Sequence, residues 1–222
     1  MKKIISVIGA GGKTTLIHRL AKEYRRKGNS VLMTTTTHMM VEADTDLSCD
    51  AFAIREKLQK EQVCMAGRLC RENPQKISML PERVLREVIP HADYILIEAD
   101  GAKHHSLKYP SDREPVILEG TTDVLLVLGT WDFGKPCGEV IFRFNEMKNR
   151  ENRELMPEEA VDAGHIQRIL RAYDRRLQAV GYTGRVQYIF SEKEEGTLSF
   201  WSSSDKEQSF TGGESAGWIP IF

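Results

Sequence analysis

The hydrophobic pattern of the first thirty-five residues changes period twice. Residues 3–8 (KIISVI) are rich in apolar and β-branched residues without strict alternation, which is typical of a strand buried on both faces. From Thr14 the apolar positions take helical spacing, and Gly28 follows a basic stretch that would end this helix. Residues 30–35 (SVLMTT) return to a strand pattern. Strand, helix and strand in this order predict a parallel crossover unit.

Further elements follow with weaker patterns. Residues 94–97 (YILI) and 123–128 (DVLLVL) are short apolar runs that predict two more buried strands. Between Thr37 and Asp93 we expect irregular chain and one helix, near residues 81–89. Pro157 is expected to open a last helix that continues to Gly181, with two acidic residues in its first turn.

The end of the chain has a different pattern. Residues 186–190, 198–201 and 218–222 look strand-like and are separated by Ser, Gly and Asp clusters. No linker is long enough to divide the chain, so we expect one domain over residues 1–222. Residues 191–222 are a candidate β-rich extension of this domain.

A glycine-rich loop stands directly between the first strand and the first helix. It reads GAGGKTT, and its candidate nucleotide-binding residues are Gly9, Ala10, Gly11, Gly12, Lys13, Thr14 and Thr15. Glycines let backbone N–H groups turn toward phosphate, a helix N-terminus favours anions, and a lysine adds a mobile cation. The hydroxyl of Thr14 would bind Mg²⁺. The match to GxxxxGK[ST] is partial, because Val7 occupies the first glycine position, and the spacing is similar to the shortened loop of Mur ligases.

Two acids at the end of a later strand are candidate partners for this loop. In YILIEADGA, Glu98 and Asp100 stand two residues apart, at the strand end where ligands collect in parallel sheets. We expect one of them to meet Mg²⁺ through water, within a water-bridged distance of the Thr14 hydroxyl, unless both merely cap the next turn. Thr36 and Thr37 follow the second strand, either near the γ-phosphate or as solvated hydroxyls.

The loop and the acids together define a fold class. We expect an α/β, three-layer, P-loop NTPase-like fold with a mainly parallel sheet flanked by helices.

Charge and hydrophobicity argue against two classes of partner, nucleic acid and membranes. The net charge of −1 recruits neither nucleic acid nor an anionic membrane, and the longest strongly apolar run, residues 124–128, is far shorter than the roughly 18 residues of a membrane span. Four cysteines without a CxxC pair favour a cytoplasmic location.

Several segments together resemble the YqeC family, described as accessory proteins of selenium-dependent molybdenum hydroxylases. These are GAGGKTTL from Gly9, TTTTHM from Thr34, EADGAK from Glu98 with the LK, P and EPVI that follow it, and a later GKP. The resemblance implies that Lys13 and Thr14 bind nucleotide and Mg²⁺ with Glu98 and Asp100 as acidic partners. It also implies that Lys103 and Lys108 line the entrance of the same nucleotide site. A molybdenum hydroxylase or its cofactor is implied as a partner.

The expected function is that of a Mg²⁺-dependent nucleoside-triphosphate-binding accessory protein and slow NTPase, with Lys13, Glu98 and Asp100 as catalytic residues. The nucleotide is ATP or GTP, and the base stays open because the strand at residues 186–190 runs into SEKEEG rather than NKxD. Two alternatives remain. One is a small-molecule kinase or a Mur-like ATP-dependent ligase, and the other is a nonenzymatic switch controlled by its nucleotide state.

Overall fold

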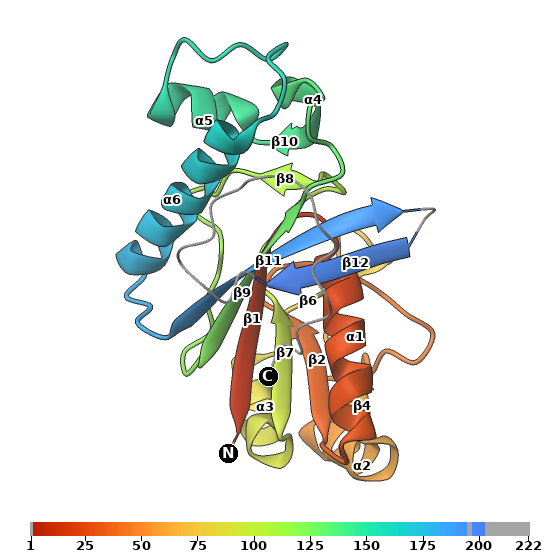
Figure 1. The fold of residues 1–222 in the computed structure, drawn as a ribbon. Coiled ribbons are helices and arrows are strands. Elements are labelled where there is room, and N and C mark those ends of the chain that lie inside the picture. The colour runs from red at the N-terminus through yellow and green to blue at the C-terminus, as the bar shows by residue number, and fades with distance from the viewer. Residues whose placement is uncertain (1, 195–196, 203–222) are drawn as a thin grey trace. The chain divides into compact units, whose positions relative to one another are not determined.

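The computed structural model describes residues 2–194 and 197–202 (Figure 1). Contacts within the chain divide it into two compact units, and each is described by itself. The first unit contains the residues before Gly9, together with Lys13–Gly101 and Val116–Val124. The second contains Gly9–Gly12, Ala102–Pro115 and the described chain from Leu125 onward.

Parallel strands form the sheet of the first unit. In order across the sheet they are β1 (Lys3–Gly9), β7 (Tyr94–Glu98), β2 (Val31–Thr35) and β4 (Val63–Met65). Tyr94 stands opposite both Lys3 and Val31, so β7 has a parallel neighbour on each side. Because these strands run in the same direction, their carboxyl ends share one edge of the sheet, which is where ligands bind in such folds.

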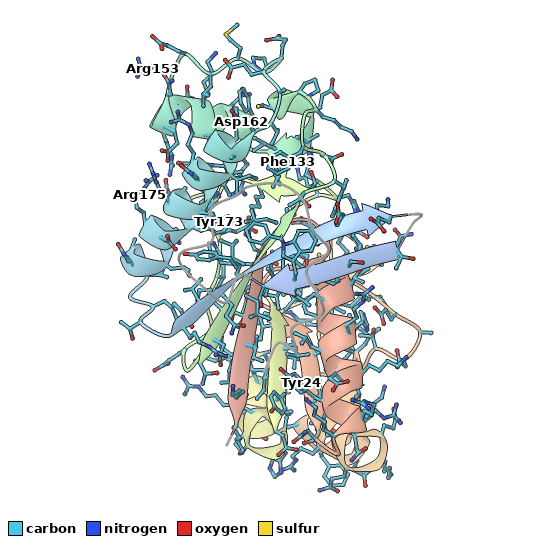
Figure 2. All side chains as sticks on the ribbon, in the orientation of Figure 1. Tyr24, Phe133, Arg153, Asp162, Tyr173 and Arg175 are labelled. Carbon is cyan, nitrogen blue, oxygen red and sulfur yellow. The ribbon has the colours of Figure 1, made fainter. Side chains whose placement is uncertain are left out.

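Helices flank this sheet. They are α1 (Lys13–Arg26), α2 (Ala51–Glu61) and α3 (Glu82–Val88), the last continued by the 3₁₀ turn η1 (Ile89–His91). α1 packs on β2 and β7, and α2 packs on β4 and α3. The apolar stripe of α1 is buried, and its Tyr24 stacks on Tyr94 with ring centroids 3.7 Å apart (Figure 2). Such a pair contributes about 0.5–1.5 kcal/mol beyond the burial of its area.

The predicted α/β class with a mainly parallel sheet flanked by helices is confirmed.

The end of α1 also follows the sequence prediction. The helix ends at Arg26, and Gly28 adopts φ +82°, where its N–H donates to the carbonyl of Arg25. A glycine in this left-handed conformation is a common end for a helix, because no Cβ opposes it.

The segment between Thr37 and Asp93 was predicted to be irregular with one helix. α3 confirms that helix, but the rest of the prediction is wrong. The segment also contains α2, β4 and a small antiparallel ladder of β3 (His38–Met40), β6 (Lys76–Ser78) and β5 (Arg68–Leu69). Strands of two or three residues are too short to show a period in the sequence. α2 had a local signal, because Asp50 caps it by accepting from the N–H of Phe52.

The second unit contains both strands and helices. Its larger strands are β9 (Asp123–Gly129), which begins in the first unit, β11 (Arg185–Glu194) and β12 (Thr197–Ser202), in the order β12-β11-β9. A short parallel pair joins β8 (Leu107–Lys108) to β10 (Ile141–Phe142). Its helices are α4 (Cys137–Val140), α5 (Phe144–Glu151) and α6 (Ala163–Ala179). The buried face of α6 includes Ile166, Ile169, Tyr173 and Leu177.

The predicted start of this last helix is wrong. Pro157 lies in a turn, and α6 begins only at Ala163, so Glu158 and Glu159 lie outside its first turn. The signal that decides the start is Asp162, whose carboxylate accepts from the N–H of His165 in a capping box (Figure 2). A capping side chain satisfies a helix N–H that would otherwise lack a partner, which proline cannot do.

β11 and β12 confirm the strands predicted at residues 186–190 and 198–201. The strand predicted at residues 218–222 lies outside the described residues, and the single domain over residues 1–222 stays a prediction. Across residues 2–194 and 197–202, no helix is long and apolar enough to cross a membrane.

Replacing Asp162 by Ala should lower the free energy of unfolding by about 1 kcal/mol, because α6 loses its N-cap. Hydrogen bonding from the N–H of His165 lowers the pKa of Asp162 below its usual value. The cap therefore contributes fully above the usual Asp pKa, and its contribution is lost as the pH falls through the lowered value. Urea unfolding from neutral pH to pH 3 measures both effects. The exposed Glu158→Ala is the matched control, and equal losses in the two variants would refute the assigned cap.

Candidate functional site

The glycines of the GAGGKTT loop occupy conformations that other residues avoid. Gly9, Gly11 and Gly12 have φ values of +88°, +89° and +107°. A Cβ on Gly9 would lie 2.2 Å from the carbonyl oxygen of Val127, and one on Gly11 would lie 2.4 Å from the amide nitrogen of Gly129. These positions therefore need glycine for two reasons, the sign of φ and the absence of space.

Not every amide of the loop is available to a ligand. The N–H of Ala10 donates to the carbonyl of Val127 at 2.9 Å, so it fixes the loop to β9 within the second unit. The candidates for phosphate are consequently the amides of Gly11 and Gly12 and those at the start of α1. Ala10 contributes to the loop by holding its path.

Lys13 and Thr14 begin α1 and both meet Glu98, the last residue of β7. The hydroxyl of Thr14 donates to Oε2 of Glu98 at 2.7 Å, and Nζ of Lys13 lies 3.7 Å from Oε1. The side chains of the ion pair are only 5% and 10% exposed. The expected proximity of an acid on this strand to Thr14 is therefore present, as a direct hydrogen bond. Thr15, by contrast, is exposed on α1.

The backbone of Glu98 holds the end of β2. Its carbonyl accepts from the hydroxyl of Thr35 at 2.7 Å and from the N–H of Thr36 at 3.2 Å. The hydroxyl of Thr36 donates to the carbonyl of Val116, and the N–H of Thr37 donates to the hydroxyl of Thr35. These bonds fix the backbone of Thr36 and Thr37. Their expected role near a γ-phosphate stays a prediction.

Asp100 is completely buried just beyond the end of β7. It stands two residues after Glu98, as the sequence required, and its role as a second acid at a metal stays a prediction. Thr35 was not among the predicted site residues, although it is buried and binds the backbone of Glu98. The run of four threonines at the end of β2 was the signal that could have identified it.

Lys103 and Lys108 belong to a cluster of the second unit. Lys108 is fully buried and forms an ion pair with Oε2 of Glu114 at 2.7 Å, and Arg143 donates to the same oxygen at 3.0 Å. All three cations lie within 5.2–5.7 Å of the ring of Phe142, a distance at which cation–π attraction operates. The expectation that both lysines line a nucleotide mouth is not tested by these contacts.

No group of three or more His, Cys, Asp or Glu side chains in the described part of the chain could hold a metal ion. The cysteines at positions 49, 64, 70 and 137 are free thiols. Burial raises the pKa of Cys64 to about 12 and that of Cys137 to about 11, which keeps both thiols protonated at neutral pH. Protonated thiols are poor metal ligands.

Comparison with known proteins matches residues 5–145 to the family model described as YqeC protein. The chain belongs to the YqeC family. It is 32% identical over 149 residues to a protein of Escherichia coli (strain K12) described as "Uncharacterized protein YqeC". That match covers 64% of this chain and 58% of the relative, so the chain spans somewhat over half the relative's length. No solved structure matches the chain.

The part matched by the YqeC model includes every predicted site residue, from Gly9 to Lys108. It also includes Glu114 and Arg143, which were not predicted as site residues. It ends before α6, β11 and β12.

Replacing Glu98 by Ala should lower the free energy of unfolding by about 3 kcal/mol, because it leaves the buried ammonium of Lys13 without this carboxylate. Chemical denaturation at neutral pH measures the loss. Glu42→Ala is the control, because Glu42 pairs with His18 in the same unit but is 38% exposed, and its loss should stay below about 1 kcal/mol. A loss at Glu98 no larger than the control would contradict the buried pair.

Proposed function

We propose that this YqeC protein binds a nucleoside triphosphate with Mg²⁺ and hydrolyses it slowly, as an accessory factor. The observation that carries the proposal is the contact of Lys13 and Thr14 with Glu98, in a helix that directly follows the glycine loop. Lysine, hydroxyl and acid are the side chains that a phosphate-binding loop requires, and here they lie at the carboxyl ends of parallel strands. The fold we propose with this function is P-loop NTPase-like.

Lys13 would bind the β- and γ-phosphates. Its ammonium now faces the carboxylate of Glu98 at 3.7 Å, and an anionic ligand at the start of α1 would offer it a second oxygen partner. The N-terminus of α1 favours the same negative charge. A cation placed where charge develops in the transition state accelerates phosphoryl transfer without a covalent enzyme intermediate.

The pair of Thr14 and Glu98 fits a Mg²⁺ ion. Mg²⁺ prefers oxygen ligands at about 2.0–2.1 Å in an octahedron, whose adjacent ligands lie about 3 Å apart. Oγ1 of Thr14 and Oε2 of Glu98 are 2.7 Å apart, close to that separation. When bound, Mg²⁺ would supply positive charge at the phosphates. Asp100, two residues farther on, is the second acid of the proposed catalytic set.

The accessory role is proposed from family membership and from the resemblance to factors of selenium-dependent molybdenum hydroxylases. The partner would be a molybdenum hydroxylase or its cofactor, and the nucleotide is ATP or GTP. A nucleotide site in an accessory protein couples binding of the partner to the nucleotide state when the two states differ in their affinity for the partner.

Replacing Lys13 by Met should raise the dissociation constant for MgATP or MgGTP at least about a hundredfold, because a charge-assisted contact to phosphate is lost while the side chain keeps its bulk. Titration calorimetry measures binding, and circular dichroism verifies the fold. Lys22→Met, an exposed substitution on the same helix, should leave binding unchanged. Binding of both nucleotides by Lys13→Met at the parent's affinity would refute the proposal.

A thermal-shift panel of nucleotides with and without Mg²⁺ should identify the base. Ligand at about 100 times its dissociation constant adds about 2.7 kcal/mol of stability. Phosphate release, measured with and without candidate acceptors, then separates the possible activities. An NTPase turns over without an acceptor, a kinase or ligase requires one, and a switch binds without turnover.

A further inference from the structure

The strands that follow the family-matched part contact the glycine loop within the second unit. β11 and β12 form an antiparallel hairpin (Figure 1). In this hairpin Ser191 stands opposite Phe200. Opposed residues in such a pair present their side chains on the same face of the sheet, and residues two positions along a strand share that face. Ser191, Phe200 and Leu198 therefore lie on one face.

Ser191 meets the loop with its hydroxyl. The side chain is fully buried, and Oγ donates to the carbonyl of Gly11, with the carbonyl of Leu128 at 3.4 Å. The backbone of Ser191 is held in turn, because its carbonyl accepts from both the N–H and the hydroxyl of Thr130. Ser191 is thus held in place by Thr130, the residue after β9, and its hydroxyl binds the carbonyl in the middle of the loop.

The two apolar side chains of this face meet the next residue of the loop. A Cβ on Gly12 would lie 2.9 Å from Cδ1 of Leu198 and 3.3 Å from Cζ of Phe200. A side chain at Gly12 would therefore displace the ends of Leu198 and Phe200, because the hairpin lies against this residue. Leu198 and Phe200 cover part of the half-buried Gly12, and a loop amide that is partly shielded from water binds an anion more strongly.

The geometry points to the β11–β12 hairpin as a positioning element of the phosphate site. Ser191 fixes the carbonyl of Gly11, so that the neighbouring amides keep one orientation, and Leu198 and Phe200 pack against Gly12. This inference rests on the proposed function and extends it to residues 191–200, which lie outside the segment matched by the family model. A preorganised loop loses less conformational freedom on binding phosphate, and this is how positioning raises affinity.

The test compares Ser191→Ala, Phe200→Ala and Phe200→Leu with the parent chain, by calorimetric titration of MgATP and MgGTP and by thermal unfolding. Ser191→Ala and Phe200→Ala should each raise the dissociation constant about tenfold, the size expected for one lost buried contact. Phe200→Leu keeps an apolar cover and should restore most of the affinity. Ser199→Ala, at an exposed residue on the opposite face of β12, is the matched control and should bind as the parent does.

The outcomes separate this inference from the proposed function. Weakened binding in the two alanine variants, with the control unaffected, supports the positioning role. A parent that binds nucleotide while Ser191→Ala and Phe200→Ala bind it equally well, even with lower melting temperatures, overturns the inference alone and assigns the hairpin a purely structural role. A parent that binds neither nucleotide overturns the proposed function and this inference together.

Discussion

Glu98 is the residue on which the arrangement of the first unit's site depends. Its carboxylate pairs with the ammonium of Lys13 and accepts a hydrogen bond from Thr14, both at the start of α1. Its carbonyl accepts hydrogen bonds from the hydroxyl of Thr35 and the N–H of Thr36 at the end of β2. A buried carboxylate is costly to desolvate, and these donors offset that cost. The start of the helix and the ends of two strands are therefore held by one side chain and its own backbone.

The order of elements was largely readable from the sequence, because long apolar patterns are strong signals. β1, β2, β7 and β9 are buried strands whose composition alone indicates them, and the stripe of α1 gives a clear helical period. The acid at the end of β7 was also readable, since parallel strands bring their carboxyl ends to one edge. What the sequence could not supply was the direct bond from Thr14 to Glu98, which depends on how far α1 lies from β7.

The errors have physical causes. β4 and the small ladder are too short to show alternation, and proline at position 157 outweighed the capping residue Asp162, although only the latter satisfies a helix amide. Contacts between residues far apart in the sequence could not be predicted for another reason. Ser191 follows a strand pattern without any sign of its acceptor, because a contact across 180 positions leaves no local trace in the sequence. The same holds for Arg143 and Glu114.

Two glycines of this chain have nearly the same backbone conformation but different requirements. Gly28 and Gly11 have φ values of +82° and +89°, yet a Cβ on Gly28 would meet no atom within 4 Å, whereas one on Gly11 would meet Gly129 at 2.4 Å. An L residue adopts positive φ only at a cost of about 1–2 kcal/mol. At Gly28 alanine would meet that conformational cost and no neighbouring atom, whereas at Gly11 it would also overlap the backbone of Gly129. Backbone conformation alone therefore opposes a side chain at the end of α1, whereas in the loop the lack of space opposes it as well.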